Sequence, residues 1–442
     1  MTTTTAIIVI FILGYACIAL ESVLKVNKAA VALMMCVGCW TLFAVGGLSA
    51  GYFESLGELG HIIEKNLGEA GTTLFFLMGA MTIVEVVDQH GGFNPVRKLL
   101  ATRSKRSLLW RFAFVTAILS AVLDNLTTSI VMIMILRKLV YERNDRMIFA
   151  AMIIIAANSG GAFSPIGDVT TIMLWNGKMI TAGGVITEII IPSFVSFIVP
   201  CFILQYSLQG DCGGFESEQQ EKLATALGYR ERMTIFILGV GGLCCVPVFH
   251  MATNLPPFMG ILCVLGILWL VLEIFYRHLP EDDNRAIRVT KMLSRIDITT
   301  ILFFLGILMA VAVLAEIGTL QQAGEWLDES TTAFGSLQHY VVTGAIGILS
   351  SIVDNVPLVA GAMKMYVVEG AGDFGVDGLF WQLLAYCAGV GGSMLIIGSA
   401  AGVTVMGMER ISFGWYLKKI TWVAFVGYIC GIGVYYVEKL IF

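Results

Sequence analysis

Two aspartate–asparagine pairs are the residues of this 442-residue chain whose type and setting point most directly to chemistry. In the apolar run Phe112–Leu136, Asp124 is the only ionisable residue, and Asn125 follows it. A carboxylate in such a run is costly to bury and by default indicates a functional site. The same phrase returns about 230 residues later as Asp354-Asn355. One copy could be a turn or a helix cap, but two copies in matching surroundings indicate a chain built twice around a buried Asp-Asn pair.

A third carboxylate, Asp168, lies in the glycine-rich segment Asn158–Thr171, in the middle of the apolar span 147–181. Three glycines and a proline cannot hold regular helix there. Within a membrane such a break is tolerated where it lines a cavity. The freed carbonyls, the Asp168 carboxylate and the hydroxyls of Thr170 and Thr171 would form an all-oxygen environment, which hard cations prefer. We therefore expect a Na⁺ site at this break.

The second half of the chain repeats the break with one difference. The segment Gly389–Ser399, inside the span 379–412, keeps the glycines but has Ser399 where the first half has Asp168. The expected site is therefore only pseudo-symmetric. It contains three carboxylates, those of Asp124, Asp168 and Asp354.

Composition places the chain in a class. Hydrophobic residues make up 57% of it and charged residues only 13%, whereas a soluble domain has about a quarter charged residues. The chain should therefore be a polytopic membrane protein. It has no Walker-type glycine loop, so ATP-driven transport is unsupported, and its ten cysteines show no spacing for a metal or redox cofactor. The segment Ala6–Leu20 lacks a preceding basic region, and we interpret it as a retained first helix.

Two apolar segments, 108–139 and 338–368, carry the Asp-Asn pairs but have arms too short to cross a bilayer alone. Basic residues flank both ends of the first, which should place both ends in the cytoplasm. A re-entrant hairpin that turns at Asp124-Asn125 satisfies both facts. The second segment is flanked by acidic residues and should be a hairpin that enters from outside. The full-length spans are expected at 6–21, 29–48, 72–88, 147–181, 184–207, 233–250, 258–276, 298–318, 379–412 and 414–437.

One hairpin from each side of the membrane is what an inverted repeat predicts. The repeat extends further, because Phe75-Phe-Leu77 matches Phe303-Phe-Leu305 at a similar offset. We expect an all-α polytopic membrane protein of two inverted repeats, each with five spans, one of them broken, and one hairpin. The first repeat should comprise residues 1–207, the cytoplasmic linker 208–231 and the second repeat 232–442. The segments 49–71 and 251–257 are poor in Lys and Arg and should be external loops.

These features resemble a known family. Opposed hairpins with polar tips, each followed by a Gly-Gly…Ile-Gly break, are similar to those of the ion transporter superfamily of secondary carriers. Within it, Leu123–Thr128, Asn158-Ser-Gly-Gly, Gly167–Thr171 and Phe75–Glu85 resemble the NhaD-type sodium/proton antiporters. The resemblance implies exchange of Na⁺ or Li⁺ for H⁺, no enzymatic activity, no nucleic-acid partner, a bacterial inner-membrane or organellar location, and a homodimer.

The resemblance also implies site residues. Asp124, Asn125, Asp168, Asp354 and Asn355 should form the Na⁺/H⁺ site. Polar residues near them should support transport: Ser120, Thr127, Thr128, Asn158, Thr170, Thr171, Ser350, Ser393 and Ser399. The family's acidic position on the third helix stays open between Glu69 and Glu85, with Asp88 nearby.

The expected mechanism is competition for the same oxygens. Burial and mutual repulsion disfavour ionised carboxylates, and carboxylates that lie close together titrate as a coupled group. At low pH the site should hold protons; as pH rises the protons leave, and a bound cation supplies the missing positive charge. Alternating access from the two faces would convert this competition into antiport.

Two other functions are compatible with parts of the pattern. A carrier for an organic anion (a dicarboxylate such as citrate) or for arsenite could have the same fold. For an organic anion, however, aspartates at both tips would repel a substrate that half-helix ends already favour. An intramembrane aspartyl protease also needs two buried aspartates, one ionised and one protonated. The chain shows no special motif around either Asp124 or Asp354 and places them on opposed hairpins, which disfavours the protease.

The charges flanking the hairpins predict a topology. Lys105 and Arg143 should lie on one side of the membrane, and Glu329 and Asp373 together on the other, because basic flanks are retained in the cytoplasm. Cysteine substitutions at these positions, probed with an impermeant thiol reagent, test the arrangement. Labelling of Lys105→Cys and Arg143→Cys from opposite sides would rule out the first hairpin, and the repeat with it.

Overall fold

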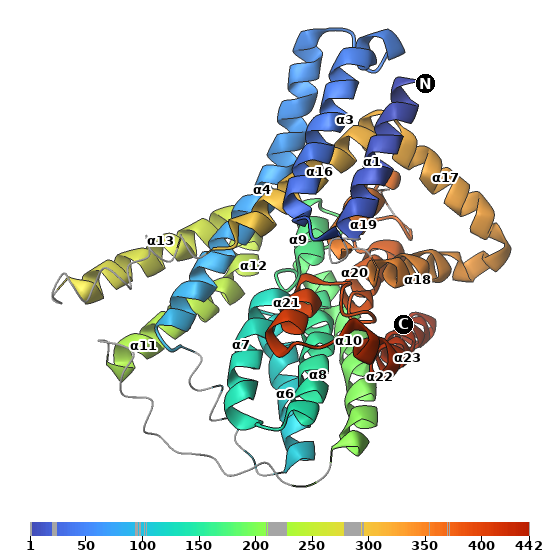
Figure 1. The fold of residues 1–442 in the computed structure, drawn as a ribbon. Helices are drawn as coiled ribbons and strands as arrows, with labels where there is room; N and C mark the ends of the chain where they lie inside the picture. Colours follow the sequence, from blue (N-terminus) through green and yellow to red (C-terminus); the bar gives the residue numbers. More distant parts are fainter. Residues whose placement is uncertain are drawn as a thin grey trace.

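The described part of the chain is built of helices, with no β-strand (Figure 1). The computed structural model describes residues 2–19, 24–92, 96, 99–100, 102, 104–208, 210, 228–277, 293, 296–352, 354–368, 370 and 372–441. Seven helices in these ranges are long and apolar enough to cross a membrane: Lys28–Ala50, Leu56–Gln89, Ala182–Ser207, Tyr229–Thr253, Pro257–Tyr276, Ile298–Glu316 and Thr421–Ile441. The expectation of an all-α, multi-pass membrane protein is confirmed.

Three of the expected spans are not among these seven. One, α1 (Thr3–Ala19), has only 17 residues. The other two are interrupted: α8 (Arg143–Ala162) is followed by a break and then α9 (Val169–Asn176), and α20 (Leu379–Gly391) is followed by a break and then α21 (Ala400–Glu409). Both breaks coincide with the glycine-rich segments.

Most of the remaining helices begin or end at recognisable sequence signals. The Asn27 side chain accepts a hydrogen bond from the N–H of Ala29 and caps α3 (Lys28–Ala50), which ends at Gly51 in a left-handed conformation. Such side-chain caps satisfy backbone groups that the first turn of a helix leaves unpaired. The other helices are α4 (Leu56–Gln89), α6 (Lys105–Ser120), α7 (Asn125–Leu139), α10 (Ala182–Leu204), α11 (Tyr229–Phe236), α12 (Gly242–Thr253), α13 (Pro257–Tyr276), α16 (Ile298–Glu316), α17 (Thr319–Thr331), α18 (Gln338–Ser350), α19 (Asn355–Met365), α22 (Phe413–Lys419) and α23 (Thr421–Ile441).

The helix α4 corrects one expectation. It begins at Leu56, so most of the predicted external loop 49–71 is helical and the predicted span 72–88 is only its second half. Two contacts explain the difference. Ser55 caps the helix by accepting a hydrogen bond from the N–H of Glu58 at 3.2 Å, and buried Asn66 donates to Glu316 at 3.0 Å. The polar residues of this segment therefore find partners within a helix.

Other boundaries also differ from the prediction. The expected span 414–437 is divided at Ile420 into α22 and α23, and α22 ends with Lys418 and Lys419, residues that favour a helix C-terminus. The helix α17 was not expected. The expected linker 208–231 overlaps α11, which begins at Tyr229; most of the linker, like the basic segment 278–292, lies outside the described residues.

The same set of helix contacts occurs in the two halves of the chain. In the first half α8 contacts α6, α7 and α10, and in the second half α20 contacts α18, α19 and α23. Contacts between the halves also correspond: α7 with α21, and α19 with α9. Figure 1 shows α6, α7, α8 and α10 side by side, with α9 between them and the group of α1, α3 and α16.

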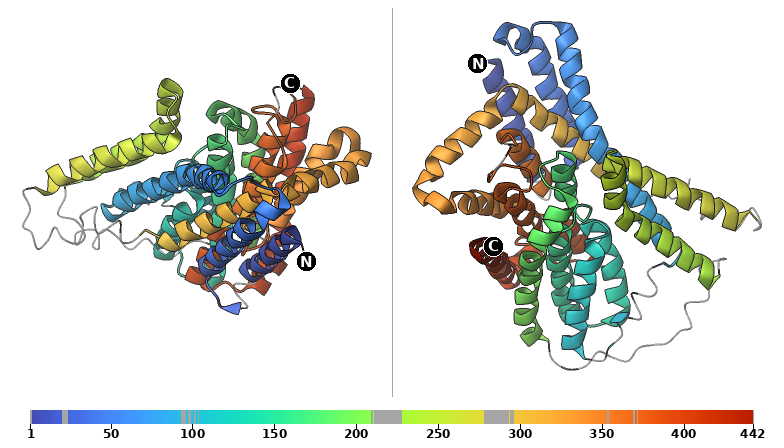
Figure 2. Two further views of the ribbon diagram at one scale, coloured as in Figure 1. Left: turned by 90° about the horizontal axis from the view of Figure 1, so that it is seen from above. Right: turned by 180° about the vertical axis from the view of Figure 1, so that it is seen from behind.

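The outer helices pair across the halves as well. The helix α3 packs on α16, and α13 packs on α4; α11–α13 extend along α4, away from α10 and α23 (Figure 2). In the inner group, glycines allow backbones to approach closely. A Cβ atom at Gly160 would lie 2.2 Å from the carbonyl oxygen of Ala117, and one at Gly391 would lie 2.2 Å from the carbonyl oxygen of Gly347.

This packing makes Gly391 sensitive to substitution. In Gly391→Ala the new methyl group would meet the backbone of α18, which cannot rotate away, so we expect a loss of roughly 1–3 kcal/mol in the free energy of unfolding. Gly407→Ala is the matched control, because a Cβ atom added at Gly407 would have no neighbouring atom within 4 Å. That change should be neutral or stabilising by about 0.5–1 kcal/mol. Thermal unfolding of the purified proteins in detergent measures both, and equal stabilities would contradict the close approach.

Candidate functional site

The first polar tip is the turn between α6 and α7 that contains Asp124 and Asn125. There Asp124 caps the N-terminus of α7. One carboxylate oxygen accepts the N–H of Thr127 at 2.7 Å, and the other accepts the Thr127 hydroxyl at 2.6 Å. Asn125 is buried, and its Nδ2 donates to Oδ1 of Asn158 on α8 at 3.1 Å. Among the described residues no lysine or arginine lies within ion-pair distance of Asp124. Its charge is therefore met by hydrogen bonds from Thr127.

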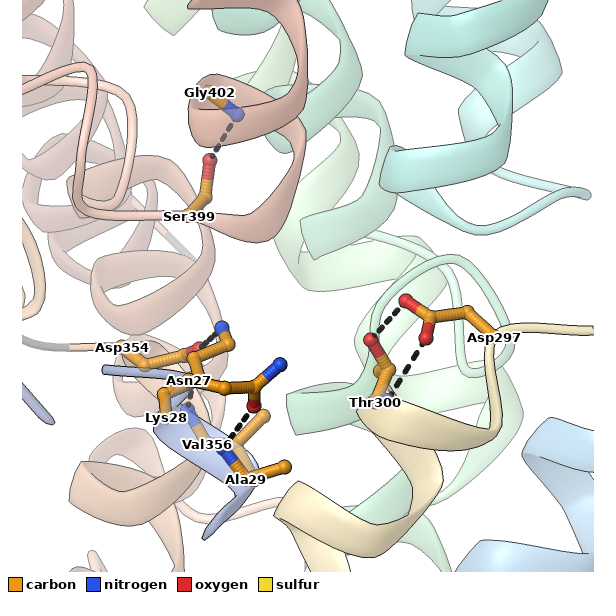
Figure 3. Close-up of polar contacts among 9 residues, drawn as sticks. All are labelled: Asn27, Lys28, Ala29, Asp297, Thr300, Asp354, Val356, Ser399 and Gly402. Carbon is orange, nitrogen blue, oxygen red and sulfur yellow. Dashed lines mark hydrogen bonds and ion pairs between the residues drawn. The ribbon is translucent and has the colours of Figure 1, made fainter. Parts of the chain in front are cut away.

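At the second tip, the negative charge of the Asp354 carboxylate has a different kind of partner. Asp354 caps α19, but its oxygen Oδ2 lies 3.1 Å from Nζ of Lys28, the first residue of α3 (Figure 3). Pro357 stands where the first half has Thr127, so this tip has neither the N–H nor the hydroxyl that caps Asp124. Its neighbour Asn355 is buried, as Asn125 is.

The buried carboxylate of Asp168 connects the second tip to the first break. Asp168 is 2% exposed. Its Oδ2 accepts from Nδ2 of Asn355 at 2.9 Å and from the hydroxyl of Thr170 at 3.1 Å. The main-chain N–H of Asp168 donates to the hydroxyl oxygen of Thr171 at 3.3 Å, which is a capping bond of α9, and that hydroxyl donates to the Asp168 carbonyl at 2.8 Å. Thr170, Thr171 and Asn355 therefore contact Asp168 directly.

Asn158, in the first half, forms a hydrogen bond with the second break. Its Nδ2 donates to Oγ of Ser399 at 3.1 Å, and the same Oγ accepts the N–H of Gly402 at the start of α21 (Figure 3). Asn125, Asn158 and Ser399 therefore form a buried chain of hydrogen bonds from the first tip to the second break. Such a chain fixes both breaks relative to each other.

The two broken helices differ at one position next to the site, where α20 has Gly389 and α8 has Asn158. Gly389 occupies the position in α20 that Asn158 occupies in α8, two residues before the glycine pair. A Cβ atom at Gly389 would lie 3.5 Å from Oδ2 of Asp168. Asn158 thus faces Ser399 on one side, and Gly389 leaves room for the carboxylate of Asp168 on the other.

The predicted supporting hydroxyls divide into two groups. Oγ of Ser120 donates to the carbonyl of Ala157 at 2.6 Å, and Oγ of Ser350 donates to the carbonyl of Ala388 at 2.8 Å. These matching bonds hold each tip against its broken helix, so both serines position the tips. Ser393 donates to the carbonyl of Val390 within its own segment.

Two cavities adjoin the site. A small one beside Asp124 and Asn125 is lined mainly by apolar residues, which come from α4, α16, the first tip and the start of α9. A larger one of about 560 Å³ lies between α4, α9, α16 and α19, and its lining includes Asn66 and Asn176. Because Asn176 ends the helix that Asp168 caps, this cavity reaches the far end of α9.

The predicted acidic residues outside the tips have partners of their own. Glu69 forms an ion pair with Lys364 at 2.7 Å at the larger cavity, and Glu85 accepts from Gln89 within α4. Among the described residues, no three His, Cys, Asp or Glu side chains gather closely enough to hold a metal ion. A bound cation would therefore need amide, hydroxyl or main-chain oxygens in addition to carboxylates.

The site residues expected from the sequence did not include Lys28, which pairs with Asp354. A signal was present in the sequence: the second tip replaces the capping threonine with Pro357. That difference leaves the Asp354 carboxylate in need of another partner, although it does not identify which residue supplies it.

The chain resembles known transporters along most of its length. The citrate transporter family model (CitMHS) matches residues 9–383. The chain is 42% identical to sodium/proton antiporter 1 of Arabidopsis thaliana, over 97% of this chain and 72% of that protein. It is 38% identical to sodium/proton antiporter 2 of the same plant, over 96% and 97%. It is 28% identical to the Na(+)/H(+) antiporter NhaD of Alkalimonas amylolytica, over 97% and 89%.

Proposed function

We propose that this chain, which belongs to the citrate transporter family and is related to NhaD-type sodium/proton antiporters, exchanges Na⁺ or Li⁺ for H⁺ across a membrane. Its family and relatives are transporters, so it is not an enzyme. The observation that carries the proposal is the buried Asp168 carboxylate, surrounded by amide and hydroxyl groups from both halves of the chain. A bacterial inner membrane and a homodimer are part of the proposal.

A buried carboxylate must be neutralised, which gives the site its chemistry. With a proton bound, Asp168 is neutral and can keep its contacts with Asn355 and Thr170. Without the proton, burial makes the charge costly unless a cation arrives. A Na⁺ ion can then take oxygens of Asp168, Thr170 and main-chain carbonyls freed by the break. Proton and cation therefore exclude each other, and Asp124 and Asp354 at the tips extend the same competition.

The helix pairs support the proposed hairpins. At the start of α6, Lys105 lies 3.2 Å from Glu142 and 2.5 Å from Asp145. Because residues 140–142 join α7 to α8, these ion pairs bring the start of α6 and the end of α7 to the same end of the bundle. In the second half, His339 at the start of α18 lies 3.3 Å from Asp373, beyond the end of α19. We therefore propose hairpins over 108–139 and 338–368.

An inverted relation of the two halves is supported by where each hairpin ends. The first ends beside the start of α8. The connection after the second lies beyond the end of α9, because the N–H of Asp377 donates to the carbonyl of Met179 and its carboxylate accepts from Thr181. Since α8 and α9 follow one another across the proposed span 147–181, the hairpins open toward opposite ends. We propose two inverted repeats, 1–207 and 232–442, joined by the linker 208–231.

The contacts within the two proposed repeats suggest which helices move during transport. Hairpins and broken helices share a continuous set of contacts, and α3 packs on α1 and α16, which meets that set at α19. We propose that the inner group moves as a transport core against the outer helices, alternately exposing the site to the two faces.

A carrier of an organic anion, such as citrate, is the alternative, and the name of the family favours it. Such a substrate would have to bind next to Asp354 and Asp168, with Lys28 the one cation paired to the tips among the described residues. The negative charge of the site argues against it.

Cation-induced collapse of a pH gradient in everted membrane vesicles tests the function directly. Na⁺ and Li⁺ should collapse the gradient, while K⁺, citrate and arsenite should not, because only small hard cations suit an oxygen site that also binds protons. Movement of citrate or arsenite without any response to Na⁺ or Li⁺ would favour the alternative.

Asp168→Ser tests whether the third carboxylate is required. Serine keeps the helix cap and copies Ser399 at the corresponding break, so the protein should fold and insert, but exchange should be abolished. Asp297→Ser is the matched control, because exposed Asp297 also caps a helix, α16, and is not one of the three proposed site carboxylates. Exchange in the same vesicle assay measures both, and near-normal exchange by Asp168→Ser would reduce Asp168 to a structural role.

A further inference from the structure

The contact between Lys28 and Asp354 joins a fixed positive charge to a proposed cation-binding carboxylate. Nζ of Lys28 lies 3.1 Å from Oδ2 of Asp354 and 4.4 Å from the centre of the Phe303 ring. The two charged side chains are 23% and 12% exposed. An ammonium group that is partly shielded from water and flanked by a ring face and a carboxylate interacts strongly with both.

The second tip depends on this ammonium more than the first tip would. At the first tip, the two hydrogen bonds from Thr127 satisfy both oxygens of Asp124. At the second, Pro357 removes both donors, and the contact from the N–H of Val356 to Asp354 is long, at 3.5 Å. A largely buried carboxylate left with so little compensation is costly. The ammonium of Lys28 supplies what the missing donors do not.

Lys28 belongs to a different group of helices from Asp354. The helix α3 packs on α1 and α16, and a Cβ atom at Gly306 of α16 would lie only 2.7 Å from the main chain of Ala32. Asn27 caps α3 immediately before Lys28 and holds the start of the helix in place. The ammonium is therefore carried by the outer helices, whereas Asp354 is carried by the α18–α19 tip.

We infer that Lys28 is a tethered competitor of the transported cation at Asp354. The inference rests on the proposed function and adds a positioning residue to it. A Na⁺ ion and the ammonium cannot both sit against one carboxylate without strong repulsion, so cation binding at Asp354 displaces Lys28. Displacement also breaks the link between α3 and the α18–α19 tip. Lys28 therefore adds an ion pair to the packing of α19 on α16, and a transported cation at Asp354 removes that ion pair.

Removing the ammonium should strengthen cation binding. In Lys28→Met, which keeps the length of the side chain but not its charge, the half-saturating Na⁺ concentration for exchange should fall roughly fivefold to tenfold, as expected for loss of one competing charge in a partly exposed site. Lys28→Arg should return it toward the wild-type value. Lys25→Met is the matched control: Lys25 is an exposed lysine next to α3, with no ion pair to a described residue, and its substitution should leave the value unchanged.

A second measurement tests Na⁺ binding in the purified protein, without requiring transport. Thermal unfolding of the purified proteins, with NaCl compared with choline chloride, should show stabilisation of Lys28→Met at lower Na⁺ than for wild type. Lys28→Gln provides the same test if the methionine variant folds poorly. Without Na⁺, the destabilisations in Lys28→Met and Asp354→Asn should be less than additive in the double variant, because both remove the same contact.

The outcomes separate the two proposals. Wild-type Na⁺ exchange combined with unchanged or weakened Na⁺ affinity in the Met and Gln variants would overturn the competitor role and leave the proposed function intact. A wild-type protein that moves protons in response to none of the cations tested would overturn the proposed function, and the competitor role with it.

Discussion

A carboxylate placed among apolar helices must be neutralised, and the arrangement of this protein follows from that constraint. Its three candidate carboxylates meet the constraint in three ways. Asp124 is capped by Thr127 of its own helix, Asp354 is paired with Lys28 from another group of helices, and Asp168 is held by groups from both halves of the chain. The first solution is local, the second uses a fixed cation, and the third uses amide and hydroxyl donors from both halves.

The broken helices provide the donors and acceptors that this constraint demands. Glycines at the breaks permit backbones to approach within contact distance, and serines tie each tip to the carbonyls of its broken helix. The two halves differ at the breaks in the charge of the residue at the corresponding position, which is Asp168 in the first half and Ser399 in the second. Asn158 faces neutral Ser399, while Gly389 leaves space beside the carboxylate of Asp168. The two breaks, which are otherwise related, thus differ by one carboxylate.

The sequence predicted the features that depend on local chemistry. Lone carboxylates, glycine-rich breaks and apolar length are visible in one segment at a time, so the tips, the breaks and most of the long helices could be located. It could not predict features that depend on a distant partner. The early start of α4 relies on Asn66 finding Glu316 some 250 residues away, and Asp354 relies on Lys28, which is 326 residues away. The positive charge of Lys28 does not by itself reveal which carboxylate it contacts.

The central claim is that protons and cations compete for the same buried oxygens. The most direct test is the half-saturating Na⁺ concentration of the wild-type exchanger in everted vesicles, measured from mildly acidic to alkaline pH. If one proton leaves for each cation that binds, that concentration should fall by about tenfold per pH unit while the site is protonated, and level off once deprotonation is complete. A half-saturating Na⁺ concentration that stays constant across this range would contradict the account.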